Sequence, residues 1–170
     1  MAEKWDAYDK YRRKTGEMIT RGEPIPAGFR HLVVHMIYYN EKGQILVQRR
    51  SETKDLAPGV WAFTGGSALA GEDSITACIR ETVEEMGFEP DMSTAELIMS
   101  YSRKDSFTDV YLIKTDVEID ALVLQPEEVA EAKWLTRSDF DKLLEENGKF
   151  WDYSYLKSVH KYLIEVEYLK

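Results

Sequence analysis

The stretch that decides the fold is GSALAGEDSITACIRETVEEMGF, residues 66–88. It begins as a glycine-rich loop and continues as a segment with helical periodicity. Asp73 or Ser74 can cap the first turn of such a helix, and Gly87 can take the left-handed conformation that ends it. We therefore expect one short helix directly after a glycine-rich loop.

The predicted helix has two faces of opposite character. At about 100° per residue, one face carries apolar side chains, namely Ile75, Cys78, Ile79, Val83 and Met86. The other face carries Glu81, Glu84 and Glu85, because positions three and four apart are neighbours on a helix. We expect the apolar face to pack against a core and the acidic face to lie opposite it.

Carboxylates clustered within one turn repel one another, at a cost of a few tenths of a kcal/mol per pair on an isolated helix. A hard divalent cation such as Mg²⁺ would offset this repulsion, since it takes oxygen ligands and keeps waters and substrate phosphates in its shell. The adjacent Arg80 can also brace one carboxylate. Composition alone favours a solvated acidic helix face, so the metal hypothesis depends on the wider spacing.

The spacing of glycine, glutamate and arginine residues from Gly66 to Phe88 resembles the Nudix box, the signature of the Nudix hydrolase superfamily. Every fixed-identity position of that pattern is filled here, by Gly66, Glu72, Arg80, Glu81, Glu84, Glu85 and Gly87, and an apolar Phe88 follows. Thr82 departs from the pattern, which prefers an aliphatic residue, although its methyl group can still face the core. The resemblance covers roughly residues 30–150 and implies an α/β fold, an α/β/α sandwich built on a mixed β-sheet.

The resemblance also implies a metal site. Glu84 and Glu85 are the leading Mg²⁺ or Mn²⁺ ligands, and Glu81 is a ligand or the general base. The carbonyl oxygen of Gly66 is a further candidate ligand, because a glycine lets the backbone approach a metal closely. Metal ions that bridge the phosphates would polarise phosphorus and acidify a bound water.

Side chains around the box are candidates for supporting roles. Glu72 is expected to brace the loop, and Arg80 to orient a box glutamate. The resemblance does not fix the general base, since Nudix enzymes place it inside the box or on a downstream loop. Glu127 and Glu128 are the candidates outside the box, and Glu128 matches an acidic position of the family, against a solvated loop glutamate. Arg49 and Arg50 end a strand near the box loop, and one of them could clamp a phosphate through its bidentate fork. Strand alternation sends these two arginines to opposite faces.

A second resemblance raises an isomerase hypothesis. The sequence from His31 to Asp55 is similar to Nudix hydrolases that resemble isopentenyl-diphosphate isomerase. The isomerases carry a catalytic cysteine and a metal-binding histidine after the tryptophan, and residues 61–68, WAFTGGSA, contain neither. The lone Cys78 lies on the apolar face of the predicted helix, where a buried inert thiol is expected. We therefore disfavour isomerase chemistry and interpret His31 and His35 as structural or substrate-facing strand residues.

Composition bounds the class of protein. The chain has 170 residues, 44% of them hydrophobic, and a net charge of −9 from 22 basic and 31 acidic residues. This fits a single domain over residues 1–170 and argues against nucleic-acid or membrane partners, which need a basic surface. The single cysteine and the lack of a long apolar run or signal segment favour a cytoplasmic protein.

The remaining elements follow from local patterns. Residues 1–29 read as an N-terminal extension, with a β-hairpin near Trp5–Asp9 that returns to Ile19 and a linker after it. The other predicted strands are 30–39, 44–50, 61–64, 95–103, 107–119 and 131–136. A helix is predicted from a cap at Thr136 or Ser138 to about Asn147, and a packed C-terminal helix over 152–168.

These observations predict a Mg²⁺-dependent hydrolase that cleaves a diphosphate linkage in a small molecule, a nucleoside diphosphate derivative or a related compound. The alternative is a non-catalytic module that senses a nucleotide or sugar phosphate, although such modules usually have eroded boxes and this box is intact. The group attached to the diphosphate is not encoded in the box. The family leaves a homodimer open.

Overall fold

The computed structural model describes residues 2–146, 148–151 and 154–169. The strands are β1 (Lys4–Tyr8), β2 (Lys14–Thr20), β3 (His31–Tyr39), β4 (Ile45–Arg50), β5 (Trp61–Ala62), β6 (Thr64–Ser67), β7 (Glu96–Ser102), β8 (Ser106–Lys114) and β9 (Val129–Leu135). The helices are α1 (Ser74–Met86), α2 (Arg137–Glu145) and α3 (Leu156–Glu165), with short 3-10 turns at Met92–Thr94 and Ile119–Ala121. None of the described helices has the length and apolar character needed to cross a membrane.

Strand β3 is the centre of the main sheet. The strand order is β5-β4-β3-β8-β7, with β6 also paired to β3 and β9 paired to β4. β3 runs parallel to β8 over its whole length and antiparallel to β4 and β6. The sheet is therefore mixed, as predicted.

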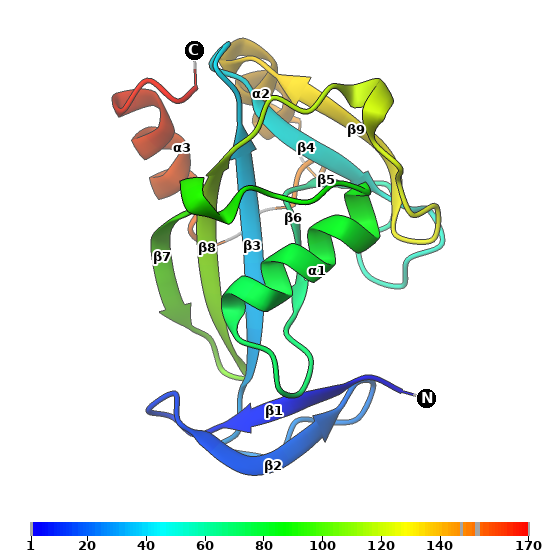
Figure 1. Ribbon diagram of the computed structural model, residues 1–170, viewed down its shortest axis with the longest axis vertical. Helices are drawn as coiled ribbons and strands as arrows, with labels where there is room; N and C mark the ends of the chain where they lie inside the picture. The colour runs from blue at the N-terminus through cyan, green and yellow to red at the C-terminus, as the bar shows by residue number, and fades with distance from the viewer. Residues whose placement is uncertain (1, 147, 152–153, 170) are drawn as a thin grey trace.

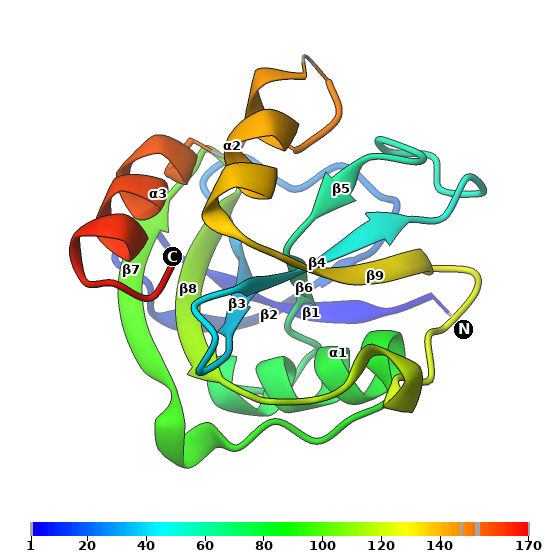
Figure 2. The ribbon, with the colours of Figure 1, turned by 90° about the horizontal axis from the view of Figure 1, so that it is seen from above.

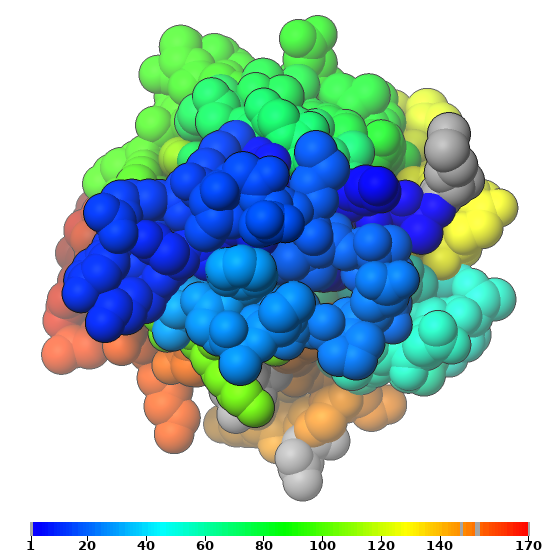
Figure 3. All heavy atoms as spheres, turned by 90° about the horizontal axis from the view of Figure 1, so that it is seen from below, coloured from blue at the N-terminus to red at the C-terminus, as the bar shows by residue number. Residues whose placement is uncertain are grey.

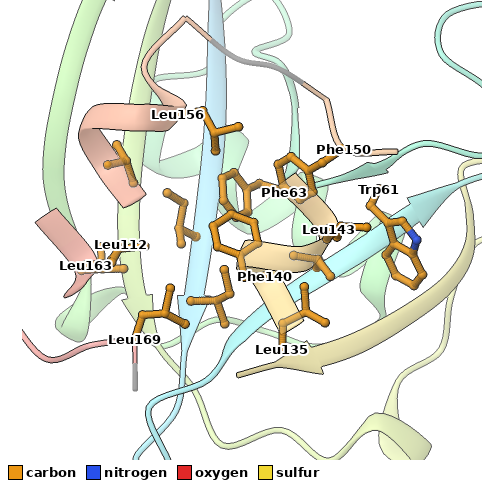
Figure 4. Close-up of a cluster of buried hydrophobic side chains, with 14 of the residues drawn as sticks. Trp61, Phe63, Leu112, Leu135, Phe140, Leu143, Phe150, Leu156, Leu163 and Leu169 are labelled. Atoms are coloured by element: carbon orange, nitrogen blue, oxygen red, sulfur yellow. The ribbon is translucent and has the colours of Figure 1, made fainter. Parts of the chain in front are cut away.

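Helices cover both faces of this sheet, with α1 on one side and α2 and α3 on the other (Figures 1 and 2). Alternation along β3 sends Val34, Met36 and Tyr38 into the core beneath α1, and Ile37 into the core beneath α2 and α3. The second core is rich in aromatic rings and leucines (Figure 4). The predicted α/β/α sandwich is confirmed.

The buried face of helix α1 matches the prediction only in part: Cys78 and Met86 are buried as predicted. Thr82 and Glu85 are buried, whereas Ile75 and Val83 are 38% and 47% exposed. The cause is polar partners in the sheet: the Thr82 hydroxyl lies 2.5 Å from the Tyr38 hydroxyl of β3, and Glu85 accepts a hydrogen bond from Gln48 of β4 (2.8 Å). Hydrophobic periodicity cannot register such partners, so the expectation that the glutamates lie opposite the core is wrong for Glu85.

Two predicted elements are too long. The strand predicted over 107–119 ends at Lys114, because β3 ends at Tyr39, whose carbonyl accepts the next N–H from Thr115 (2.9 Å). The terminal helix predicted over 152–168 spans Leu156–Glu165, and Glu167 has a φ of 60°, which a right-handed helix cannot continue through. Residues 152 and 153 lie outside the described residues.

The hairpin of β1 and β2 packs across one end of the sandwich (Figures 1 and 3). Tyr8 and Arg30 exchange backbone hydrogen bonds of 2.8 and 3.0 Å. The Arg12 guanidinium, at the hairpin turn, forms two hydrogen bonds with the buried Asp109 carboxylate of β8 (2.8 and 2.5 Å). A two-stranded hairpin is marginal alone, so these contacts to the sandwich fix it.

We predict that Arg12→Ala destabilises the protein by about 1–3 kcal/mol, because it leaves the Asp109 carboxylate buried without its cationic partner. Chemical denaturation measures this change in the free energy of unfolding. Arg13→Ala is the matched control, since the exposed Arg13–Asp9 pair of the same turn should contribute less than about 1 kcal/mol. Equal effects of the two substitutions would contradict the assignment.

Candidate active site

The helix α1 begins and ends at the residues predicted. Asp73 is the N-cap, and its Oδ1 accepts a hydrogen bond from the Thr76 N–H (2.8 Å). Gly87 has a φ of 73° and ends the helix in the left-handed conformation. These two ends fix which turns of the helix face the preceding loop.

Arg80 is the centre of a network that joins α1 to the glycine-rich loop. Its Nε and Nη2 donate to both oxygens of Glu72 (2.8 and 3.0 Å), and Nη2 also donates to the Ser67 carbonyl (3.0 Å). Its Nη1 lies 3.0 Å from carboxylate oxygens of both Glu81 and Glu84. Glu72 in turn accepts the Leu69 N–H (2.8 Å), so the guanidinium orients box carboxylates while Glu72 braces the loop.

Gly66 brings the backbone of β6 against the Glu81 carboxylate. Residues of β6 pair with β3 in a register that sets Gly66 opposite Val34. A Cβ added at Gly66 would overlap the carboxylate group of Glu81. The position therefore requires glycine for close approach rather than for an unusual φ.

Glu85 is buried against the sheet, with 6% of its surface exposed. Its Oε2 accepts a hydrogen bond from Nε2 of Gln48 on β4 (2.8 Å), and the Gln48 carbonyl oxygen accepts one from the Thr64 hydroxyl (3.0 Å). Burial raises the pKa of Glu85 to about 8, and burial likewise raises the pKa of Glu81 to about 7 despite the nearby Arg80. Both carboxyls are held where a negative charge is costly.

A cleft of about 560 Å³ opens over these carboxylates. Its box residues are Gly65, Gly66, Ser67, Arg80, Glu81, Glu84 and Glu85. The end of β4, the loop after it and the segment before β9 supply Arg50, Thr53, Lys54, Asp55, Leu56, Gln125, Glu127 and Glu128. Glu3, Trp5 and Arg21 of the N-terminal hairpin complete the lining. Cations and carboxylates therefore face one another across one cavity.

The structure separates the two arginines at the end of β4. Arg50 lines the cleft, and its Nε donates to the Leu56 carbonyl (3.1 Å). Arg49 lies outside the cleft lining and pairs with Glu52 and Glu131. Of the pair, only Arg50 is placed to contact a ligand in this cleft.

The other predicted candidates divide between the cleft and the core. Glu128 lines the cleft and pairs with Lys54 (2.5 Å). His35 lies in the opposite core, where its Nδ1 is 2.9 Å from the Tyr155 hydroxyl, and burial lowers its pKa to about 3. His31 stacks on Trp5. Cys78 is fully buried, and burial raises the pKa of its thiol to about 12, as expected for an inert cysteine.

Comparison with known proteins decides the family. The chain matches the NUDIX domain family over residues 29–159. It belongs to the Nudix hydrolase family. An uncharacterized Nudix hydrolase of Listeria monocytogenes is 39% identical over 158 residues, covering 92% of this chain and 93% of that protein.

Two solved structures share the fold of this Nudix hydrolase. DR0079 from Deinococcus radiodurans has a TM-score of 0.75 at 23% identity and covers 96% of this chain and 98% of its own. The NUDIX domain of Shewanella oneidensis NrtR, solved in complex with ADP ribose, has a TM-score of 0.61 at 16% identity, covering 86% of this chain and 94% of its own. Neither comparison tests the similarity to Nudix hydrolases that resemble isopentenyl-diphosphate isomerase, so that similarity stays a prediction.

Nudix enzymes generally use divalent metals, and the donor set here fits one. Burial disfavours the charged form of Glu81 and Glu85, which a divalent cation would stabilise, and the lack of a side chain at Gly66 lets the Glu81 carboxylate lie directly against the backbone of β6. As the side chains stand, the described residues contain no cage of His, Cys, Asp or Glu around one point. Glu84, the third carboxylate, pairs with Arg80 at 3.0 Å and is 52% exposed, and it would join Glu81 and Glu85 in holding a metal.

Sequence reasoning missed several residues of this Nudix site. Gln48 could have been predicted as a site residue, because it is a polar residue two positions after Leu46 on the same buried strand face. Lys54 lies in a polar loop that has no pattern of its own. Trp5 and Arg21 come from a hairpin whose position over the cleft depends on tertiary contacts, and no local signal places them there.

We predict that the metal-free enzyme loses stability as the pH rises from about 5 to 8.5. The folded protein raises the pKa of Glu85 from 4.5 to about 8 and that of Glu81 to about 7. It therefore binds protons more tightly than the unfolded chain, and this stabilisation, on the order of 2–4 kcal/mol, disappears through that range. Chemical denaturation of chelator-treated protein across pH measures it.

Glu85→Gln is the matched variant, because glutamine keeps the shape of the side chain without the titrating group. It should flatten most of the pH dependence and should be more stable than the wild type at pH 8.5. Mg²⁺ or Mn²⁺ should restore stability to the wild type at high pH and have a smaller effect on the variant. A pH dependence unchanged by Glu85→Gln would contradict the assigned burial.

Proposed function

We propose that this Nudix hydrolase cleaves a diphosphate linkage in a nucleoside diphosphate derivative and depends on Mg²⁺ or Mn²⁺. The observation that carries the proposal is the charge arrangement of one cleft: the buried Glu85, the largely buried Glu81 (side chain 12% exposed) and the exposed Glu84 lie on α1, and Arg21, Arg50 and Lys54 line the same cavity. Carboxylates without bound cations would repel a diphosphate. A divalent cation bound by the carboxylates would reverse this repulsion, so that the carboxylate side and the cationic side of the cleft could both contact the diphosphate.

Each box residue has a role in this proposal. Glu84, Glu85 and the Gly66 carbonyl would hold the metal, with Glu81 as a further ligand or as the base. The metal, when bound, supplies Lewis acidity to the phosphorus and lowers the pKa of a water. Arg80 keeps Glu81 oriented, and its contacts with Glu72 and the Ser67 carbonyl hold the loop that follows Gly66 and β6.

Residues outside the box would handle the substrate and the proton. Arg50 would donate to a phosphate oxygen through its guanidinium fork. Glu128 lines the cleft and is the candidate base outside the box. Its carboxylate pairs with Lys54 at 2.5 Å, which holds it at the cleft.

The nucleoside diphosphate class rests on likeness and on chemistry. The NUDIX domain of Shewanella oneidensis NrtR was solved with ADP ribose, a compound with a diphosphate between a nucleoside and a sugar. A small molecule of this class suits a cleft of about 560 Å³. A homodimer and a cytoplasmic location stay predictions.

The experiment is a turnover panel of nucleoside diphosphate sugars, dinucleotides, nucleotides and isoprenoid diphosphates, run with Mg²⁺ and with Mn²⁺. We expect metal-dependent release of product from one class, reduced by about 100-fold or more in Glu84→Gln and Glu85→Gln, because even residues behind metal ligands contribute about 10–100-fold. Glu89→Gln, on the exposed residue just after α1, is the control.

Several outcomes would contradict the proposal. Turnover unchanged by Glu84→Gln and Glu85→Gln in folded protein would remove the metal role. Tight binding of a nucleotide or sugar phosphate without product would indicate a sensing module. Isotope exchange into isopentenyl diphosphate would indicate an isomerase.

We predict that Arg50→Ala lowers kcat/KM by about 10–100-fold, since a hydrogen bond to a charged group contributes about 1.5–3 kcal/mol. Arg49→Ala should change it by less than about twofold, because Arg49 pairs with glutamates outside the cleft. Steady-state kinetics of the two variants provide a matched comparison on adjacent residues. The reverse ranking would show that Arg49 contacts the substrate.

A further inference from the structure

The N-terminal hairpin supplies part of the cleft. Glu3 directly precedes β1, Trp5 lies on β1, and Arg21 directly follows β2. These residues line the same cavity as the box glutamates. The match to the Nudix family begins only at residue 29. The hairpin therefore lies outside the matched domain, yet it forms one wall of the cleft over the box glutamates.

This wall is fixed to the sandwich and to the glycine-rich loop. Arg12 holds Asp109 of β8. The Ala70 N–H donates to the Lys4 carbonyl (2.8 Å), and the Gly71 N–H donates to Asp6 (3.0 Å). A wall held on two sides can present side chains at a defined position relative to the box.

Trp5 is the aromatic side chain of this wall. It stacks on His31 with ring centroids 4.2 Å apart and planes 16° from parallel. Among the described residues that line the cleft, no other is aromatic. The buried Nε1–H of Trp5 meets no acceptor in the described part of the chain, which disfavours the fold. Phenylalanine would pack here without that penalty, so packing alone does not account for an indole.

Arg21 is the cation of the same wall. It pairs with Glu3 at 2.8 Å, and the two side chains are 53% and 44% exposed. Such an exposed pair is held weakly, so Arg21 can exchange the Glu3 carboxylate for a phosphate oxygen. The neighbouring cleft cations Arg80 and Lys54 already hold carboxylates at the cavity.

Resting on the proposed function, we propose that the β1–β2 hairpin selects the substrate: Trp5 contacts a nucleobase attached to the diphosphate, and Arg21 contacts a phosphate of the same compound. Any of the four nucleobases can stack on an indole, because each has a flat π-face, and a guanidinium pairs with phosphate. The box then acts on the diphosphate between them. These specificity-determining residues lie outside the segment that defines the family.

The test compares nucleoside diphosphates bearing adenine, guanine, cytosine or uracil with ribose 5-diphosphate, which lacks a base. For Trp5→Leu, KM should rise about 10-fold or more for the preferred base-bearing compound and change less than twofold for ribose 5-diphosphate. Trp5→Phe should retain most of the preference. Tyr11→Ala, at an exposed aromatic residue of the hairpin turn outside the cleft, is the control, and thermal unfolding of each variant monitors folding.

A second arm tests Arg21. Arg21→Ala should raise KM by about 10-fold for base-bearing and base-free compounds alike, whereas Glu3→Gln should lower KM by freeing the guanidinium. Arg13→Ala, whose partner Asp9 lies at the hairpin turn, is the control. If Arg21→Ala behaves as Arg13→Ala does, the phosphate contact is overturned.

The outcomes separate this inference from the proposed function. Wild-type turnover with equal effects of Trp5→Leu on base-bearing and base-free compounds overturns the hairpin's role and leaves the hydrolase intact. A wild-type preference for isoprenoid diphosphates also overturns it. Absence of turnover overturns the proposed hydrolase function, and binding of the same compounds is then measured by calorimetry. Tighter binding of base-bearing compounds that is abolished by Trp5→Leu supports the hairpin's role in selection. Equal binding of base-bearing and base-free compounds overturns that role.

Discussion

The contact of Arg80 with Glu72, Glu81 and Glu84 is the interaction on which the site depends. One guanidinium joins the glycine-rich loop to α1 and offsets the repulsion between carboxylates that lie one turn apart. It also fixes the loop that brings Gly66 against Glu81. Without this cation, the repulsion between Glu81 and Glu84 would have no cationic neighbour to offset it, and the loop would lose the link between Glu72 and α1.

Burial of Glu85 is the second constraint, and it runs against stability. The carboxyl packs under the helix with Gln48 as its hydrogen-bond donor, and its pKa is raised to about 8 by burial. Buried carboxyls with a raised pKa occur at functional sites, and a bound divalent cation would offset the cost of the negative charge. The wide α1-side core and the mixed sheet supply the apolar burial that offsets this cost.

Much of the fold and of the box was predictable because the information was local. Asp73, Gly87 and the spacing of the glutamates define a capped helix after a loop, and alternation defines the strands. The buried face of α1 was not predictable, because Thr82 and Glu85 enter the core through partners on β3 and β4. The hairpin's contribution to the cleft depends on the long-range pair of Arg12 and Asp109, which no local pattern contains.

The measurement that tests the account most directly is hydrolysis of the preferred diphosphate compound in ¹⁸O-enriched water, followed by ³¹P NMR of the products. The account predicts ¹⁸O in the phosphate group of one product, with no incorporation after chelation and restored incorporation on adding Mg²⁺ or Mn²⁺. Incorporation at the same rate in the presence of chelator would contradict a metal-dependent attack of water at the carboxylate cluster.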